Sequence, residues 1–479
     1  MVLVVWSRRR VPPLRGALGV ISSDDLGRTL KLELDESRAA TTEEAQRLAA
    51  TYRIGVRLGE GFWTNRAATA AALTTINCAV RAFRGGVFVA ADDDAVIAYG
   101  WGLGKRLSAV VAGYGATMVD HLPDDLPFVV SINEPRSTDQ TSKGPTILYA
   151  TWDGWAGGVV AEPGHRRNED DGQPLAGVLA GALAVSEAFQ SIRGFAIAGR
   201  RPVGLSLWRP DLSWLDPLGH GPALDVLPEK IWLLGLGHLG QAYAWSLGWL
   251  PYPSRALMVG LVDPQYIVKA NVDTGLLAAL EHVEKRKTRI VADRLEALGM
   301  RTLLVERSFD ANFRRGPSEP ALAFAGFDSP EPRRHLEAAG FMRIVDAGLG
   351  GGPQYLEMLL HAFPSELRSA TAFPQAERSD AEALLDRPAY VAEIARREAD
   401  GLTNEAARCG VVEIAGRTVG AAFVGAAASA LVLAEELRAL HDGSRFEVVS
   451  WSLRSPEHIQ TVVNPAPGPD TNPGYVTVT

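Results

Sequence analysis

The sequence predicts an α/β protein with a doubly wound, Rossmann-like parallel sheet. It also predicts two related units in tandem, of which the first is degenerate. Three observations lead to this fold class. An apolar strand runs straight into a glycine turn at residues 231–240, strand and helix patterns alternate on both sides of that turn, and one small-residue helix pattern occurs twice.

The glycine turn is the most informative motif of the chain. Residues 231–240 read Ile-Trp-Leu-Leu-Gly-Leu-Gly-His-Leu-Gly, which gives the spacing Gly235-x-Gly237-x-x-Gly240. The first glycine makes the tight turn, the second lets the backbone approach a phosphate, and the third lets the next helix pack on the strand. A second strand ends on Asp263, 23 residues after Gly240, where a carboxylate can accept hydrogen bonds from ribose hydroxyls. The motif predicts that the chain binds an adenine nucleotide.

Alternating strand and helix patterns surround the turn. In the second half of the chain, the expected strands are 231–235, 256–262, 302–306, 322–325 and 343–346, and the expected helices are 239–249, 275–298 and 330–340. In the first half, the expected strands are 54–58, 87–91 and 128–132, with a helix at 67–83. The first half has only a decayed glycine turn at 58–62, so we expect it to have lost its ligand.

An internal repeat favours the tandem arrangement. The same spacing joins a glycine, a leucine and a glutamate in two helices rich in small residues: Gly177, Leu183 and Glu187, and Gly425, Leu431 and Glu435. Small residues allow such helices to pack very closely against a sheet or another helix.

The domain boundaries follow from composition. Prolines cluster at 208–228, between the two halves. We therefore expect a degenerate, inactive α/β partner unit at 1–225 and a nucleotide-binding domain at 226–445. A charged crossover insertion is expected within that domain at 365–410, and a C-terminal extension at 446–479.

Composition excludes several classes of protein. The net charge of −8 argues against nucleic-acid binding as the main task. Two cysteines, Cys78 and Cys409, rule out a disulfide framework and a four-cysteine zinc site. The most apolar window, 419–434, is too short to span a membrane. With no secretory signal visible, we expect a cytoplasmic protein that binds no membrane.

Five further residues carry the chemistry. Asp263 and Asp328 each end an apolar strand. Asn271 comes eight residues after Asp263, Arg333 comes five residues after Asp328, and Lys287 lies between them at the start of an amphipathic helix. Two strand-end carboxylates with a lysine and an arginine suit a magnesium triphosphate: Asp263 for the ribose, Lys287 for phosphate charge and Asp328 for Mg²⁺. An NAD(P)-dependent oxidoreductase is the alternative, because Asp263 fits NAD as well as ATP.

This order of motifs resembles the ThiF-type adenylating family, which includes the ubiquitin-activating enzymes, over roughly residues 226–440. The matching positions are Gly235, Gly237, Gly240, Asp263, Asn271, Lys287, Asp328 and Arg333. The resemblance implies that ATP and Mg²⁺ are used to adenylate the C-terminal carboxylate of a small ubiquitin-like (β-grasp) or sulfur-carrier protein. It implies catalytic roles for Lys287, Asp328 and Arg333, and a chain that is either a monomer with tandem halves or a homodimer.

Two positions affect what the chain can catalyse. Where the family has Asn-Leu-x-Arg-Gln, this chain has Asn-Val-Asp-Thr-Gly at 271–275, so Thr274 replaces an arginine that touches the phosphates. Another arginine (Arg66, Arg286 or Arg289, or one from a partner) then has to substitute, or the chain is a nucleotide-binding pseudoenzyme scaffold. Cys409, next to Arg408, is the candidate for a thioester in a second catalytic step.

Overall fold

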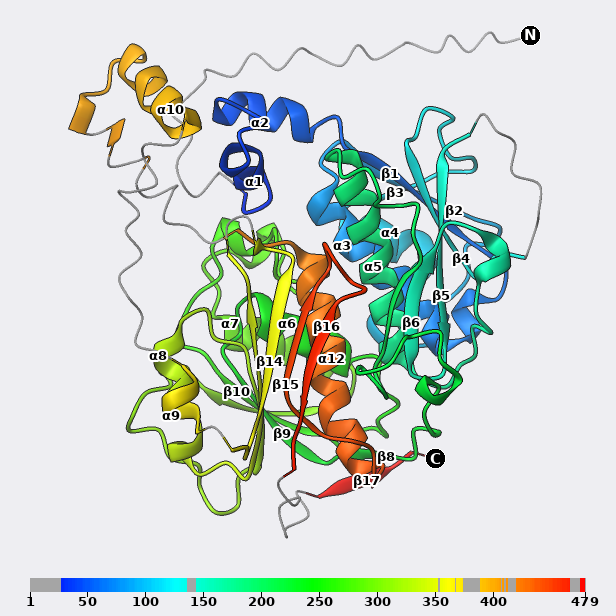
Figure 1. The fold of residues 1–479 in the computed structure, drawn as a ribbon, viewed down its shortest axis with the longest axis vertical. Coiled ribbons are helices and arrows are strands. Elements are labelled where there is room, and N and C mark those ends of the chain that lie inside the picture. The colour runs from blue at the N-terminus through cyan, green and yellow to red at the C-terminus, as the bar shows by residue number, and fades with distance from the viewer. Residues whose placement is uncertain are drawn as a thin grey trace, which may run out of the picture.

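Two β-sheets with the same strand order organise the chain (Figure 1). The computed structural model describes residues 27–135, 144–351, 354–366, 368–373, 388–405, 407–408, 411, 419–465 and 474–478. The first sheet has seven strands. In spatial order they are β3 (Thr117–Met118), β2 (Gly86–Ala91), β1 (Arg53–Leu58), β4 (Phe128–Ile132), β5 (Thr146–Asp153), β6 (Ala156–Val160) and β7 (Val203–Ser206).

The second sheet has eight strands in the matching order. They are β11 (Arg301–Val305), β10 (Met258–Val262), β9 (Lys230–Leu234), β12 (Leu322–Ala325), β13 (Arg343–Leu349), β14 (Glu357–Phe363), β15 (Phe446–Ser452) and β16 (Ile459–Val463). The expected strands and the helix of the first half, and all five expected strands of the second half, are present within three residues of their predicted bounds.

The expected parallel pairing is confirmed for one side of each sheet, and antiparallel strands extend the other side. The first five strands in each spatial order are parallel, and the remaining strands run antiparallel. The cause is local in the first sheet: β5 turns directly into β6 at Gly154, whose φ of +55° a side chain would disfavour. A tight hairpin can join only antiparallel strands.

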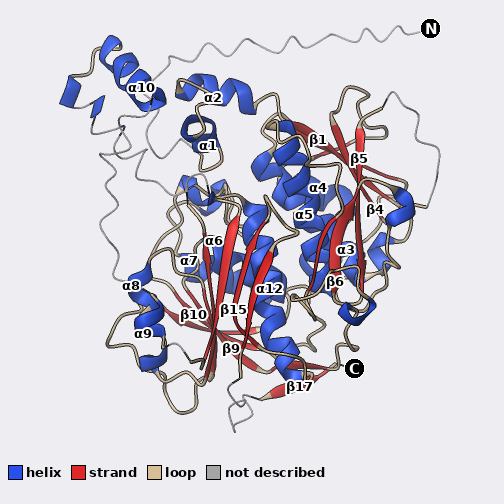
Figure 2. Cartoon of the chain, viewed as in Figure 1, coloured by secondary structure: helices blue, strands red, loops and turns tan. Residues whose placement is uncertain are grey.

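A layer of helices lies between the sheets (Figure 2). In this layer α5 (Pro174–Ile192) packs on α3 (Arg66–Ala82) and on α12 (Ala422–Leu440), which packs on α6 (His238–Leu247). Small residues make this possible: a Cβ added to Gly177 would lie 2.1 Å from the carbonyl oxygen of Ala67. The core side chains of both halves form one continuous apolar cluster. Of the described helices, α5 alone is long and apolar enough to cross a membrane, and it is mostly buried.

Shorter helices flank this framework. Helices α1 (Leu30–Asp35) and α2 (Thr42–Ala49) lie against α10 (Pro388–Ala399), where the Tyr390 hydroxyl donates to Asp35. The remaining α-helices of the described chain are α4 (Leu107–Tyr114), α7 (Lys287–Ala297), α8 (Pro330–Arg333) and α9 (Ser369–Ala372). The predicted crossover insertion therefore contains at least one helix, α10, within the part that the structure describes.

Three further sequence expectations differ from the structure. The helix expected at 330–340 is divided into α8 (Pro330–Arg333) and a short 3₁₀ helix at Glu337–Ala339. The helix expected at 275–298 begins only at Lys287, because Glu284 has a left-handed φ of +70° that a right-handed helix cannot include. The segment 446–479, expected to be an extension, supplies strands β15 and β16 to the second sheet, and β17 (Tyr475–Thr477) pairs with β8 (Val226–Pro228). Their pairing is long-range, and the local pattern of residues gives no signal for it.

Candidate functional site

A cavity of about 840 Å³ lies where strands β9, β10 and β12 end. Ligands of doubly wound sheets bind at this edge. Seven of the residues selected from the sequence line the cavity together: Gly235, Gly237, Asp263, Asn271, Lys287, Asp328 and Arg333. Gly240 lies behind the turn, and Cys409 lies outside the residues that the structure describes.

The three glycines of the turn do three different things. Gly235 has a φ of +80°, which favours glycine. A Cβ on Gly240 would lie 1.9 Å from the carbonyl oxygen of Gly235, so only glycine lets α6 pack this closely on the turn. Gly237 faces open space, with nothing within 4 Å of an added Cβ. The backbone at Gly237 is therefore the part of the turn that a ligand can approach.

Asp263 fixes the glycine turn to the next strand. Its side chain is 5% exposed, and its Oδ2 accepts the N–H of Leu236 at 2.7 Å, while its Oδ1 accepts the N–H of Gln265, also at 2.7 Å. A carboxylate oxygen has two lone pairs, so both oxygens can accept one more donor each. Asp263 thus holds the turn in shape and still presents an acceptor to the cavity.

Lys287 is a buried cation at the start of α7. Its Nζ donates to Oε1 of Gln265 at 2.6 Å, and the residue is 5% exposed. Burial lowers the pKa of Lys287, the charges of Asp263 and Asp328 raise it, and Arg28 lowers it. An ammonium held in a largely dry wall interacts strongly with an arriving anion.

Asp328 and Arg333 follow strand β12 and line the same cavity. Asp328 is exposed. The Arg333 guanidinium is held from behind: Nη2 donates to the carbonyl oxygens of Phe327 and Ala347, and Nε lies 3.4 Å from Oδ1 of Asp346. The two residues thus present opposite charges to the same cavity, one accessible and one anchored.

The position of the missing arginine is occupied by a buried side chain. Thr274 is 1% exposed, and its methyl carbon would lie 3.2 Å from a Cβ on Gly420. An arginine there would have to displace the segment that leads into α12.

None of the three substitutes proposed from the sequence is among the described residues that line the cavity. Arg66 lies over the ring of Tyr99, Arg286 over the ring of Tyr266, and Arg289 pairs with Glu306 at 2.8 Å.

Arg28 is the cavity residue that sequence reasoning missed. It lies two positions before the first residue of α1. The fold brings it to the cavity wall, where its charge lowers the pKa of both Lys287 and His238. No motif surrounds Arg28 in the sequence, so only the tertiary structure could reveal it.

Two helix N-termini point at the cavity. Helix α6 begins at His238, and α12 begins after Val419 and Gly420, which line the cavity. His238 fills the space between them: burial lowers its pKa to about 3, and a Cβ on Gly425 would lie 2.4 Å from its Nε2. His238 is therefore neutral and packs between the two helix ends. Helix N-termini carry partial positive charge and favour anions.

In the first sheet, the chain's own atoms fill the corresponding edge. A Cβ on Gly59 would lie 2.1 Å from the carbonyl oxygen of Asn133. At the start of α3, the carboxylate of Asp171 accepts the N–H of Ala67 at 3.1 Å. In the first half, the carboxylate of Asp171 thus occupies the N-terminus of α3. In the second half, the N-terminus of α6 faces the cavity instead.

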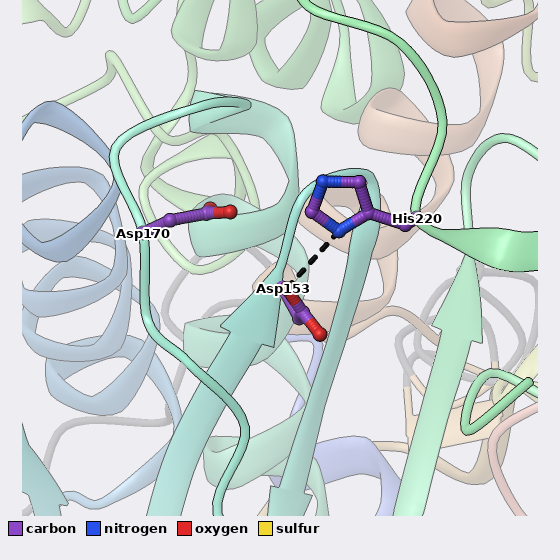
Figure 3. A group of neighbouring side chains, drawn as sticks. All are labelled: Asp153, Asp170 and His220. Carbon is purple, nitrogen blue, oxygen red and sulfur yellow. Dashed lines mark hydrogen bonds and ion pairs between the residues drawn. The ribbon is translucent and has the colours of Figure 1, made fainter. Parts of the chain in front are cut away.

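A second polar cluster lies at the β5–β6 turn (Figure 3). Asp153, Asp170 and His220 bring three ligand atoms within 4.8 Å of one another. Their groups already have partners: Asp153 accepts from Arg167 at 2.8 Å and from the His220 ring at 3.1 Å, and Asp170 accepts from the backbone N–H of Gly154 at 3.1 Å. A guanidinium on Asp153 competes with any cation, so we interpret the cluster as a clamp on the turn.

The fold and the cavity define an α/β protein of the Rossmann-like class, with an open site at the edge of its second sheet. Family models of the BilD N-terminal domain and the BilD C-terminal domain match residues 53–207 and 227–443. The bacterial E1-like protein BilD of Collimonas sp. (strain OK412) is 36% identical over 441 residues, which cover 91% of this chain and 93% of that protein. The chain belongs to the BilD family of bacterial E1-like proteins.

The E1-like part of the resemblance drawn from the sequence is thereby confirmed. A crystal structure of PaaA is also similar, with 12% identity and a TM-score of 0.33 over 49% of this chain and 64% of that one. That likeness is too low to support an argument about function.

Proposed function

We propose that this protein uses ATP and Mg²⁺ to adenylate the C-terminal carboxylate of a small ubiquitin-like (β-grasp) or sulfur-carrier protein. The observation that carries the proposal is the composition of the cavity. It combines the glycine turn, two helix N-termini and three cationic side chains (Arg28, Lys287 and Arg333) with the exposed carboxylate of Asp328. Membership in an E1-like family supports the same class of reaction.

The cavity residues fit a magnesium triphosphate. Open space at Gly237 leaves room for phosphate oxygens against the backbone, and Lys287, Arg333 and Arg28 would offset their charge. The spare lone pairs of Asp263 suit ribose hydroxyls. Asn271 holds this wall in shape, because its Oδ1 accepts the N–H of Val268 at 3.0 Å. Asp328 would hold Mg²⁺, which prefers oxygen ligands and would offset phosphate charge when bound.

The proposed reaction needs positioning more than proton transfer. A carboxylate oxygen of the carrier protein attacks the α-phosphorus of ATP, the bond from that phosphorus to the bridging oxygen breaks, and pyrophosphate leaves with the bonding electrons. The carboxylate is already ionised, so no side chain has to act as a base. The cationic residues stabilise the charge that develops on the phosphates. We propose that Cys409 then attacks the acyl-adenylate, forms a thioester and releases AMP.

We also propose that the first half is the inactive partner unit. Its counterpart of the nucleotide site is filled by Asp171 and the Asn133 backbone, which leaves one active site per chain. Tandem halves would then let a monomer do what two identical subunits do in a homodimer.

The expected cytoplasmic location stays a prediction.

Asp328→Ala should lower carrier-dependent ATP–pyrophosphate exchange by about 100-fold, because it removes the proposed Mg²⁺ ligand from a site built around phosphate charge. The exchange is measured with a glycine-ended β-grasp protein as acceptor. Asp293→Ala is the matched control: Asp293 is an exposed carboxylate on α7 that does not line the cavity. Equal exchange in the two variants would remove the role that we give Asp328.

Arg28→Ala should weaken binding of Mg-ATP about tenfold, since it removes one charge-assisted contact to the phosphates. Isothermal titration with Mg-ATP measures the change. Arg289→Ala serves as control, because Arg289 was a substitute candidate and instead pairs with Glu306 outside the cavity. Loss of affinity in Arg289→Ala but not in Arg28→Ala would reverse the assignment of the missing arginine.

The two alternatives from the sequence have distinct signatures. A melting temperature raised by NADH but not by Mg-ATP would favour an NAD(P)-dependent oxidoreductase, since saturating ligand adds about 2.7 kcal/mol of stability at a hundredfold excess over Kd. Binding of Mg-ATP without exchange would favour a pseudoenzyme scaffold. The buried Thr274 in place of an arginine is the observation behind the scaffold alternative.

A further inference from the structure

Asp346 is a buried carboxylate that the proposed reaction does not use. It lies in strand β13, between Ala325 of β12 and His361 of β14 in the strand register, and it is 0% exposed. Among the described residues, neither carboxylate oxygen has a hydrogen-bond partner. Burial raises its pKa to about 7, and the charge of Arg333 lowers it. A buried carboxylate with so little compensation is costly, which calls for a reason to keep it.

The groups that face Asp346 leave Arg333 as its countercharge. The Tyr243 hydroxyl donates to the carbonyl oxygen of Ala325 at 2.8 Å. Burial lowers the pKa of His361 to about 4, so this imidazole is neutral near pH 7. The Arg333 Nε, in contrast, lies 3.4 Å from Oδ1 of Asp346.

The guanidinium of Arg333 has Asp346 behind it and the cavity in front of it. Its Nη2 donates to the carbonyl oxygens of Phe327 and Ala347, and its Nη1 lies over Gly348, where an added Cβ would be 2.7 Å away. The central carbon of the guanidinium, Cζ, lies 5.5 Å from the centre of the Phe373 ring. The position of the Arg333 guanidinium is thus defined by its surroundings: two carbonyls, one carboxylate, one aromatic face and the space left by the missing side chain of Gly348.

We propose that Asp346 is a positioning residue: its carboxylate, from inside the sheet, holds the Arg333 guanidinium at the cavity wall in the orientation that receives the phosphates. The inference rests on the proposed function, because it gives Arg333 a phosphate to receive. The contact is a charge attraction at 3.4 Å without a hydrogen bond, and Nη2 is held by two backbone carbonyls, so Asp346 acts on the orientation of the guanidinium through its charge.

A double-mutant cycle on Mg-ATP binding tests this. Asp346→Asn and Arg333→Gln should each raise the Kd for Mg-ATP by about tenfold, and the double variant should bind within about twofold of Arg333→Gln alone, since the carboxylate then has no guanidinium to position. A merely structural role for Asp346 would instead give losses that multiply. If the wild-type protein binds Mg-ATP and the losses of the two single variants multiply in the double variant, this inference alone is wrong. If the wild-type protein does not bind Mg-ATP, the proposed function is wrong and this inference falls with it.

Two more variants keep the test decisive. Gly348→Ala places a methyl group against the Arg333 guanidinium and leaves the charge of Asp346 in place. It should raise the Kd by a similar factor, and it remains informative if Asp346→Asn fails to fold. An unchanged Kd in Gly348→Ala counts against the inference. Glu187→Gln is the matched control for loss of a buried charge, because Glu187 is 1% exposed and pairs with Arg201 in the first half. It should lower the melting temperature and leave the Kd unchanged.

Discussion

Gly240→Ala is expected to destabilise the fold by about 3 kcal/mol and to abolish binding of Mg-ATP, because overpacking against rigid backbone forces the chain to shift. The added Cβ would lie 1.9 Å from the carbonyl oxygen of Gly235. No side chain can rotate away to relieve that contact, so α6 and the turn must separate. Urea denaturation measures the stability and isothermal titration the binding.

Gly237→Ala is the matched comparison in the same turn. Its Cβ meets nothing within 4 Å, but its φ of −76° with a ψ of −140° lies outside the main regions that alanine adopts, so stability should fall by about 1–2 kcal/mol, less than in Gly240→Ala. The methyl group nevertheless protrudes where phosphate oxygens should lie, and we expect Mg-ATP affinity to fall at least about tenfold. Unchanged affinity in Gly237→Ala would show that the phosphates do not lie against this turn.

The site residues that could be found from the sequence are those with local motifs. The glycine turn and Asp263 sit directly after an apolar strand and Asp328 three residues after one, and the carboxyl ends of parallel strands meet at one edge. Lys287 is placed by the helix that it begins. These positions follow from chain geometry over a few residues, which is what a pattern of residues encodes.

The site residues that could not be found are brought in by long-range packing. Arg28 belongs to the first half of the chain, and its place in the wall of a cavity of the second half depends on how the two halves pack together. Asp346 sits in the middle of an apolar strand, where its relation to Arg333 depends on how β13 packs beside α8. Strands β14 to β16 pair antiparallel across a long crossover. None of these relations leaves a periodic signal in the sequence.

The internal repeat is a case where a weak pattern matches a physical function. Glu187, near the end of α5, accepts the N–H of Gly199 at 2.7 Å and pairs with Arg201 at 3.0 Å. Glu435, at the same place in α12, accepts the N–H of Phe446 at 3.1 Å and pairs with Arg343 at 3.2 Å. In both helices the glutamate accepts a backbone N–H from the chain segment that follows the helix, so equal spacing in the sequence corresponds to the same kind of backbone contact in the structure.

Glu435→Ala should therefore cost about 4 kcal/mol of stability, because breaking a buried ion pair leaves its partner charge uncompensated. Arg438, which also pairs with Glu435, is 0% exposed and cannot turn to solvent. Glu187→Ala should cost less, since Arg201 is 15% exposed and can regain water. Urea denaturation of both variants measures the difference, with Glu435→Gln expected to recover part of the loss by keeping an acceptor for the Phe446 N–H. Both glutamates contact a backbone N–H, but only Glu435 pairs with a fully buried arginine. Equal losses in the two alanine variants would therefore mean that the backbone contacts outweigh the buried charges.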